Sequence, residues 1–590
     1  MPTITINGQQ CDFEPGERII DVADRCDIEI PKYCYHPGLS VPAQCRICLA
    51  EIWAPNARND NKLEPMAGGK LMPTCATDAT DGMVVYANSP KAVANQKSVM
   101  EYLLINHPLD CAICDQAGEC TLQDYSYKYG RGVSRFEETK LKQPKKNLGP
   151  NVYLYADRCI MCTRCVRFAR EIPETGELMI DGRGNKSQID VFPGVPLAND
   201  LSGNVIDLCP VGALLDKDFL FAQRVWFLKK NATIDGLTSS GDNLWAEHNQ
   251  GRLYRFKPRT NLELNTWWIT DEVRYSWKHV HSEARVKSPR RRQNGAAVEC
   301  EWPKAVLEAI KTMTPAPHDG GGKRLMVVVS PMLASEDAYA LATLAMAIDP
   351  QAVLAVGPVP TDGEDQSFAN PRATKPFVKR AEKAPNARGV RRVLEAVSPG
   401  GVLEYAAMLT RLNKDGSDIG AVFLTGNYPS DWATDELKRG VSGRPLVVAD
   451  LLESWLTEHA DVVLPAASWL EQAGSFENAD GVIQSYSQAI PTQHESKGLG
   501  QLATDLHAVL EGGALTSPKG AYSDFIVDDG AGQVPGASDT VTLPRARLFV
   551  AADVRAEMAE RHVELRPLVD EIRHPPITGK LEADVQVVEL

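Results

Sequence analysis

Cysteine placement is the feature that most limits what this chain can fold into. Of its 14 cysteines, 13 lie between Cys11 and Cys209, and Cys300 alone lies beyond them. Disulfides would be the interpretation for a small secreted protein, whereas close cysteine clusters in a long chain favour metal or iron-sulfur binding. The first third of the 590 residues is therefore predicted to be specialised for cofactor binding.

Length and charge narrow the possible function classes. A chain of 590 residues exceeds what one hydrophobic core can hold and predicts about three to five domains. Its net charge of -14 argues against a general nucleic-acid binder, so its partners are expected to be proteins. Because the sequence has no long apolar run and no basic-then-apolar leader, we expect membrane contact only through a complex.

The opening residues predict a small sheet followed by a helix. Ile4 and Ile6 alternate with polar residues. The Asn7-Gly8 dipeptide after them supplies a hairpin turn that tolerates positive φ. Apolar residues at helical spacing then predict a helix within residues 17–26. This order of elements, followed by a cysteine-bearing loop, is typical of a ferredoxin-like domain.

A second helix and a linker are predicted next. Ser89 is placed to cap a helix that has Pro90 at its first position and ends near residues 106–108. Its apolar face is predicted to contain Val93, Val99, Leu103 and Leu104. Residues 137–150, which are rich in lysine and hold two prolines, are predicted to be a linker.

The first predicted donor set consists of Cys34, Cys45, Cys48 and Cys75, spaced C-x10-C-x2-C-x26-C. A C-x2-C pair in a loop, with one more thiolate on each side, is how a ferredoxin holds a [2Fe-2S] cluster. The first gap here is longer than in plant-type ferredoxins. A four-cysteine zinc site and unligated core cysteines are alternatives, although zinc usually takes two short pairs and this set has one.

The second predicted donor set combines histidine with cysteine: His107, Cys111, Cys114 and Cys120. Four donors so close in sequence can surround one [4Fe-4S] cluster if the chain wraps around it, and Gly118 would help that wrap. A lone histidine beside proline would otherwise mark a helix end. Neutral imidazole is a competent donor, and exchanging it for a thiolate makes the cluster less negative and raises its reduction potential.

The third predicted donor set consists of Cys159, Cys162, Cys165 and the remote Cys209, which precedes Pro210. In two-cluster bacterial ferredoxins, a C-x2-C-x2-C-x3-C-P run gives three cysteines to one cluster and the fourth to the other. Half of that arrangement is missing here, because the matching positions are Ala169, Asn199, Ser202 and Val205. One [4Fe-4S] cluster is therefore predicted.

These ligands indicate an electron carrier rather than a complete enzyme. No nucleophile–base pair accompanies them, so no catalytic residue is predicted, and Cys11, Cys26 and Cys300 are interpreted as buried apolar residues. Gly182-Arg183-Gly184 lacks the strand-to-helix context of a dinucleotide fingerprint and is predicted to be a tight turn.

The second half of the chain predicts a parallel sheet flanked by helices. β-branched runs alternate with helical stretches, and strands are predicted at 325–329, 353–356, 421–424, 446–449 and 462–464. Charge, glycine and proline dominate residues 286–297 and 360–390. Those two segments are predicted to be exposed insertions.

Two stretches, Met100 to Gly130 and Asp157 to Cys165, resemble the family of the large iron-sulfur subunit of respiratory complex I, an NADH-quinone oxidoreductase. Residues 75–77 and 81–83 also resemble the family's fourth [2Fe-2S] ligand and the strand after it, with an insertion implied near 54–70. The resemblance implies that electrons pass from a flavin subunit that oxidises NADH to a ferredoxin-like subunit and on to quinone.

The later part of the chain resembles the molybdopterin-oxidoreductase fold, at residues 460–465 and 471–481. In molybdenum enzymes of that fold, a cysteine-rich motif opens the domain, and Cys, Ser or selenocysteine binds the metal. The corresponding stretch here, residues 232–244, contains no cysteine. Neither an extra cluster nor molybdenum is therefore expected.

The predicted fold class is multidomain, α+β and α/β. The predicted domains are a [2Fe-2S] ferredoxin-like domain (1–88), a His/Cys [4Fe-4S] segment (89–136), a [4Fe-4S] ferredoxin-like domain (137–220), a metal-free molybdopterin-oxidoreductase-like domain (221–515) and a C-terminal extension (516–590). The expected cofactors are one [2Fe-2S] and two [4Fe-4S] clusters.

Two other functions remain open at this stage. The chain could be the diaphorase-arm subunit of an NAD-linked hydrogenase or formate dehydrogenase, or an assembly protein with structural zinc. Hydrogenase arms of this type often end near residue 240, and a formate dehydrogenase would keep the cysteines that this chain lacks. The preferred prediction is an electron-transfer subunit of NADH:quinone oxidoreductase, peripheral on the cytoplasmic side of the inner membrane, beside the flavin/NADH-binding subunit and ferredoxin-like subunits.

Overall fold

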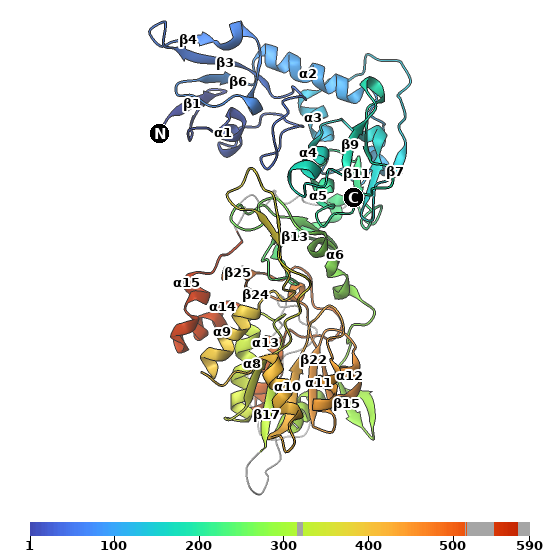
Figure 1. The fold of residues 1–590 in the computed structure, drawn as a ribbon, viewed down its shortest axis with the longest axis vertical. Coiled ribbons are helices and arrows are strands. Elements are labelled where there is room, and N and C mark those ends of the chain that lie inside the picture. The colour runs from blue at the N-terminus through green and yellow to red at the C-terminus, as the bar shows by residue number, and fades with distance from the viewer. Residues whose placement is uncertain (315–322, 514, 516–547, 576–590) are drawn as a thin grey trace, which may run out of the picture. The chain divides into compact units, whose positions relative to one another are not determined.

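The computed structural model describes residues 1–314, 323–513, 515 and 548–575 (Figure 1). The chain divides into two compact units. Unit 1 contains Met1–Lys229, Thr266–Asp271 and Ser367–Phe377, and unit 2 contains Lys230–Asn265, Glu272–Gln366 and Val378–Leu590. Among the described helices, none has the length and apolar character needed to cross a membrane.

Unit 1 opens with a mixed six-stranded sheet in the order β2-β1-β6-β3-β4, with β5 paired to β3. Its strands are β1 (Thr3–Ile6), β2 (Gln9–Asp12), β3 (Leu49–Asn56), β4 (Lys62–Pro65), β5 (Met72–Pro73) and β6 (Val84–Tyr86). The predicted hairpin is confirmed, because β1 and β2 pair antiparallel across Asn7 and Gly8, both at positive φ. The predicted helix is α1 (Ile19–Arg25). The β3–β4 hairpin occupies the segment where an insertion was implied.

Two helices follow the sheet domain. Helix α2 (Pro90–Leu104) begins as predicted, with the Ser89 side chain accepting a hydrogen bond from the Ala92 amide at 3.2 Å, and α3 is Thr121–Tyr129. The predicted apolar face of α2 is confirmed in part, because Val99, Leu103 and Leu104 pack partly buried against the core of unit 1. The most buried residues of α2 are Ala92, Gln96 and Met100, and Gln96 satisfies its buried amide by donating to the Ala87 carbonyl at 3.0 Å.

The remainder of unit 1 builds a second small domain. A three-stranded sheet has the order β11-β8-β7, from β7 (Lys145–Asn147), β8 (Val152–Tyr155) and β11 (Leu214–Asp216). Helices α4 (Arg164–Glu171) and α5 (Asn204–Leu208) and the hairpin of β9 (Leu178–Asp181) and β10 (Gln188–Val191) complete it. The predicted glycine turn joins β9 to β10, with Gly182 and Gly184 at positive φ. The linker prediction for 137–150 is partly wrong, because β7 lies within this segment and pairs with β8.

Unit 2 contains a seven-stranded sheet in the order β16-β15-β23-β22-β21-β17-β18. Its strands are β15 (Arg290–Gln293), β16 (Ala296–Glu299), β17 (Arg324–Val329), β18 (Val353–Val356), β21 (Ile419–Thr425), β22 (Leu446–Asp450) and β23 (Val462–Pro465). The five predicted strands are present, and each pairs parallel with its neighbours among the five. The fold-class prediction is confirmed here.

Helices cover both faces of this sheet (Figure 1). One core packs α7 (Trp302–Met313), α8 (Ser335–Ile348), α9 (Ala387–Val397) and α13 (Leu499–Leu510) onto the sheet. The other packs α10 (Tyr405–Asn413), α11 (Asp435–Val441) and α12 (Trp455–His459). Adjacent strand residues such as Val327 and Val328 enter opposite cores, because side chains alternate across a strand.

Both predicted exposed insertions contain ordered strands. Within 286–297, β15 pairs antiparallel with β23 and extends the large sheet. Its arginine-rich composition does not predict a strand, but the charged side chains find partners in the fold, Arg290 in Glu453 and Arg292 in the Ala460 carbonyl. Within 360–390, β19 (Gln366–Phe368) and β20 (Phe377–Lys379) pair, and both of their phenylalanines are buried.

Smaller elements complete unit 2. A three-stranded sheet consists of β12 (Lys229–Ile234), β13 (Asn243–Asn249) and β14 (Arg252–Pro258), and β24 (Gly474–Glu477) pairs with β25 (Ile483–Tyr486). Of the predicted C-terminal extension, residues 516–547 and 576–590 lie outside the described residues. The described part contains α14 (Ala551–Arg561) and α15 (Pro567–Asp570), which insert Met558 and Leu568 into the unit 2 core.

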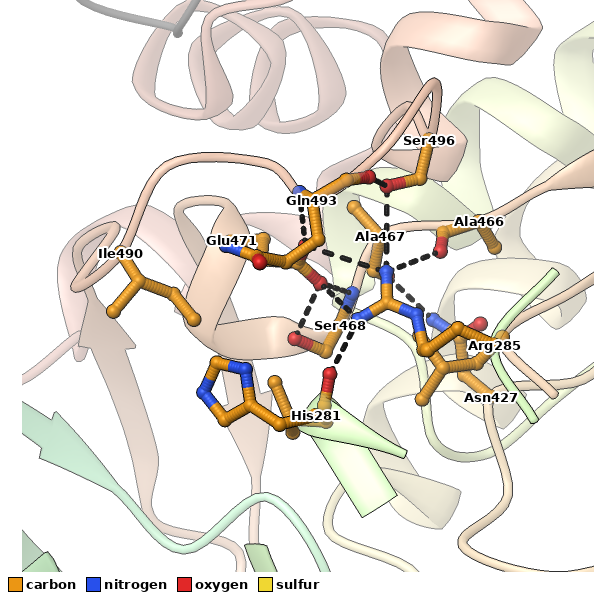
Figure 2. A network of polar contacts seen from close by, with 12 residues as sticks. His281, Arg285, Asn427, Ala466, Ala467, Ser468, Glu471, Ile490, Gln493 and Ser496 are labelled. Carbon is orange, nitrogen blue, oxygen red and sulfur yellow. Dashed lines mark hydrogen bonds and ion pairs between the residues drawn. The ribbon is translucent and has the colours of Figure 1, made fainter. Parts of the chain in front are cut away.

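A buried ion pair between Arg285 and Glu471 ties distant segments of unit 2 together (Figure 2). The Arg285 Nη1 and Nη2 atoms lie 3.1 and 3.3 Å from the two Glu471 carboxylate oxygens. Glu471 also accepts hydrogen bonds from the backbone N–H and hydroxyl of Ser468 and from the backbone N–H of Gln493. Because neither side chain of the pair is more than 1% exposed, each needs the other to compensate its charge.

Candidate iron-sulfur sites

The four cysteines of the first predicted donor set lie together in unit 1. The Cys48 and Cys75 Sγ atoms are 3.5 Å apart, and a hydrogen bond from Cys34 lowers the pKa of Cys45. The pKa of the Cys75 thiol is raised by its hydrogen bond with Cys48, by burial and by the charges of the other three cysteines. The first three come from the loop between α1 and β3, and Cys75 comes from the short 3-10 turn Thr74–Ala76.

The loop that carries this set holds an unusual backbone shape. Ala43 and Arg46, on either side of Cys45, have φ of 50° and 59°. Non-glycine residues rarely adopt that region, and such strain is kept only where the surroundings enforce it. The Asn95 side chain donates to the Arg46 carbonyl at 2.8 Å, which fastens the loop to α2.

His107, Cys111, Cys114 and Cys120 line one small cavity in unit 1. Gly118, at φ 93°, turns the chain between the third and fourth of them, as the sequence predicted. Cys111 opens the short 3-10 turn Cys111–Ile113, and Cys120 is the residue before α3. The structure therefore brings together all four predicted donors of the second set.

His107 has the character of a ligand in this cavity. Its Nδ1 is buried and has no hydrogen-bond partner among the residues that the structure describes. Burial lowers the pKa of His107 to about 4, and the Arg158 charge acts in the same direction. The imidazole is therefore neutral near pH 7 and keeps a lone pair for a metal. An orphaned buried nitrogen among three thiols fits an iron-sulfur cluster.

Cys159, Cys162, Cys165 and Cys209 line a second small cavity. Met161 and Thr163, which alternate with the first three cysteines, have φ of 52° and 63°, and they bend the chain around the cavity. Burial raises the pKa of Cys159 to about 12 and that of Cys209 to about 11. Thiols that resist ionisation in an apolar site become thiolates when they bind a metal, which supplies the missing positive charge.

The positions where a second bacterial cluster would lie are filled by protein. Ala169 and Val205 are fully buried and belong to the core of unit 1. Asn199 bonds to Glu177, and Ser202 donates to Asp271. The leftover cysteines lie elsewhere, with Cys11 buried and Cys26 half-buried in the N-terminal domain, and Cys300 half-buried in unit 2.

The third donor set adjoins both of the others. The Gln44 amide donates to the Met161 carbonyl at 3.0 Å, and Arg167 donates to the Cys34 carbonyl. On the other side, the Thr121 amide donates to the Pro210 carbonyl at 3.1 Å. The first and second sets are joined by aromatic packing, because Tyr33 beside Cys34 contacts Tyr125 of α3 with ring centroids 5.3 Å apart.

Among the described residues, no group of three or more His, Cys, Asp or Glu side chains is arranged to hold a single metal ion.

Among the lining residues of the His107 cavity that sequence reasoning missed are Arg158 and Gly212. A Cβ added at Gly212 would lie 2.2 Å from the Cys114 Sγ, so only glycine fits there. The available signals were weak: Arg158 directly precedes Cys159, and Gly212 follows Cys209 closely. Cys159 and Cys209 belong to the third donor set, so their closeness in sequence does not reveal that Arg158 and Gly212 face the cavity of the second set.

Four family models match the chain. They are described as a 2Fe-2S iron-sulfur cluster binding domain (residues 1–90), the NADH-ubiquinone oxidoreductase-G iron-sulfur binding region (96–135), the NADH-quinone oxidoreductase subunit 3 ferredoxin-like domain (149–215) and molybdopterin oxidoreductase (385–507). The order of these matches confirms the predicted fold class. The chain has 2Fe-2S and 4Fe-4S binding domains ahead of a molybdopterin-oxidoreductase domain.

Curated relatives agree with the family models. The 78 kDa subunit of mitochondrial NADH-ubiquinone oxidoreductase from Neurospora crassa is 40% identical over 317 residues, 53% of this chain and 41% of that protein. The G subunit of NADH-quinone oxidoreductase from Rickettsia felis is 34% identical over 344 residues, 58% of this chain and 49% of that protein. The match thus spans less than half the length of these relatives.

A solved structure also matches part of the chain. It is a crystal structure of NAD+-reducing [NiFe]-hydrogenase in the H2-reduced state, 26% identical with a TM-score of 0.33, and the match covers 38% of this chain and 91% of that one. The family models and the curated relatives agree with the resemblance carried by the cysteine motifs: over the matched residues, the chain is similar to the G subunit of NADH-quinone oxidoreductase.

Proposed function

We propose that this chain is the electron-transfer subunit of an NADH:quinone oxidoreductase. The observation that carries the proposal is the arrangement in unit 1, where three donor sets adjoin one another. Iron-sulfur clusters, when bound, take up and release single electrons. A relay built on these sets has the Cys159 set in the middle, hydrogen-bonded to the first set through Gln44 and to the second through Pro210.

The proposed ligands are those of the three sets. Cys34, Cys45, Cys48 and Cys75 would hold one [2Fe-2S] cluster; His107, Cys111, Cys114 and Cys120 one [4Fe-4S] cluster; and Cys159, Cys162, Cys165 and Cys209 another. An arginine then keeps two neighbouring sets at a fixed spacing. Arg167 on α4 donates to the carbonyls of Cys34 and Ser40, so the first loop cannot move away from the third set.

Partners and location follow from the same proposal. No dinucleotide fingerprint occurs in the sequence, so a flavin subunit that oxidises NADH would supply the electrons, and a ferredoxin-like subunit would receive them on the way to quinone. The complex would place this chain on the cytoplasmic side of the inner membrane. The molybdopterin-oxidoreductase match at 385–507 supports this function over a hydrogenase arm, which we expect to end near residue 240.

Reductive titration of the full chain, purified without oxygen and followed by electron paramagnetic resonance, tests the proposal. We expect one [2Fe-2S] signal and two [4Fe-4S] signals, each appearing with the uptake of one electron. The Cys48→Ala variant should lose the [2Fe-2S] signal and keep the others. A chain that takes up no electrons would refute the proposed function.

A further inference from the structure

A buried positive charge faces the cavity of the second donor set. Arg158 lines this cavity together with His107 and Cys114, and its side chain is 1% exposed. A fully buried arginine is rare unless something compensates it. Its only neighbour in sequence with a proposed ligand role is Cys159, which belongs to a different set. Arg158 therefore has a position that sequence adjacency does not explain.

Four contacts fix the Arg158 guanidinium in place. Its Nε and Nη2 lie 3.2 and 3.0 Å from the Asp110 Oδ2, and its Nη1 lies 3.5 Å from the Gly212 carbonyl oxygen. Its Cζ stacks 4.1 Å from the centroid of the Tyr155 ring. Gly212 leaves room for the Cys114 Sγ beside the Arg158 side chain, because it has no Cβ. A Cβ built at Gly212 would lie 2.2 Å from the Cys114 Sγ and 3.9 Å from the Arg158 Cδ.

The two members of the Arg158–Asp110 pair are not equally shielded from water. The Asp110 side chain is 29% exposed, whereas that of Arg158 is 1% exposed. Water screens an exposed charge far more than a buried one, so the negative member acts weakly on the cavity and the positive member acts strongly. The cavity therefore experiences a net positive potential from the pair.

We propose that Arg158 raises the reduction potential of the cluster held by His107, Cys111, Cys114 and Cys120. The inference rests on the ligand assignment of the proposed function. One-electron reduction adds one negative charge in this cavity, and a fixed guanidinium stabilises that charge. No bond forms or breaks and no proton moves in this step, so the effect is electrostatic. Arg158 would act in the same direction as the exchange of a thiolate for His107.

Opposite shifts from the two members of the pair separate this role from a purely structural one. Arg158→Gln removes the positive charge and should move the midpoint potential of this cluster to more negative values. Asp110→Asn removes the opposing charge in a similar shape and should move it to more positive values. Arg158→Lys keeps the charge and should remain close to the unchanged chain. A role in packing alone would not reverse sign between Arg158→Gln and Asp110→Asn.

Arg224 offers a matched control at the same site. Its Nη2 donates to the Cys111 carbonyl at 3.1 Å, and its guanidinium lies 4.5 Å from the ring centroid of the exposed Trp226. Because Arg224 is only half-buried, Arg224→Gln removes an equal charge that water already screens. Its shift should be smaller than that of Arg158→Gln.

The test is a redox titration of the full chain, monitored by electron paramagnetic resonance, with iron content measured on each sample. The signal that Cys114→Ala loses identifies the cluster. The inference holds if Arg158→Gln and Asp110→Asn shift its midpoint in opposite directions while the [2Fe-2S] midpoint stays in place. If Arg158→Gln loses its iron, a positive shift in Asp110→Asn supports the inference, and no shift or a negative one overturns it. Full iron with unmoved midpoints overturns this inference alone, whereas an iron-free unchanged chain refutes the proposed function itself.

Discussion

Cys48 and Cys75 have Sγ atoms 3.5 Å apart although they are 27 positions apart in the chain. The β3–β4 hairpin accounts for most of that separation, and β5 then pairs antiparallel with the start of β3 and returns the chain to the neighbourhood of Cys48. The Thr74 hydroxyl then donates to the Cys48 carbonyl at 3.0 Å and fixes the return. The long gap in the first donor set is therefore compatible with a compact site.

The closeness of these two sulfur atoms predicts the effect of losing one. Cys75→Ala should abolish the [2Fe-2S] signal and lower iron content by about two atoms per chain, while both [4Fe-4S] signals persist. Cys11→Ala, at a buried cysteine of the same domain outside the donor sets, is the control. Visible absorbance and iron analysis measure the result. Retention of all iron in Cys75→Ala would remove Cys75 from the ligands.

Gly212 predicts a selective loss at the second set. Gly212→Ala places a Cβ 2.2 Å from the Cys114 Sγ, so this thiol must leave its position. We expect the variant to lose about four irons per chain and one [4Fe-4S] signal, with the [2Fe-2S] signal unchanged. Gly132→Ala, where an added Cβ meets nothing within 4 Å, should keep its full iron content. Equal iron in both variants would show that the cavity tolerates the methyl group.

The Arg285–Glu471 pair predicts a large effect on stability. Glu471→Gln leaves the buried guanidinium uncompensated, and we expect the free energy of unfolding to fall by about 3–5 kcal/mol. Chemical denaturation followed by tryptophan fluorescence measures this loss. Glu308→Gln removes the partner of the exposed Lys311 and should cost less than about 1 kcal/mol. Similar losses in the two variants would mean that the buried pair contributes no more than a surface pair.

His279 predicts sensitivity of unit 2 to acid. Burial lowers the pKa of His279 to about 4, from 6.5, as its ring stacks on Trp469. The unfolded chain therefore binds the proton first as pH falls, so stability decreases between about pH 6.5 and pH 4, by about 3 kcal/mol from this group.

The His279→Gln variant checks this assignment. Its free energy of unfolding should depend less on pH in that window than that of the unchanged chain. Parallel profiles for the unchanged chain and His279→Gln would assign the acid sensitivity to other groups.

The grouping of the proposed donors in unit 1 could be predicted from sequence because their spacing is largely local. Three members of each set lie close together in the chain, and short loops leave few ways to arrange them. The parallel strands of unit 2 were equally predictable, because strands buried on both faces, such as β17, are continuous apolar runs.

Other features depend on tertiary contacts that composition conceals. Strand β15 consists of arginine and glutamine, and its pairing with β23 becomes visible only when the rest of the sheet is in place. Gln96 is buried on α2 because a carbonyl from outside the helix accepts its amide. Arg158 faces the His107 cavity through the fold of the second domain, so its neighbour Cys159 gives no indication of its role.

Iron, acid-labile sulfide and zinc per chain, measured on the full chain prepared without oxygen, test whether the three donor sets hold iron-sulfur clusters. The account predicts about ten irons with a similar amount of sulfide, from one [2Fe-2S] and two [4Fe-4S] clusters, and little zinc. Zinc near one ion per donor set, with little iron and no sulfide, would show that the sets are structural and that the chain carries no electrons.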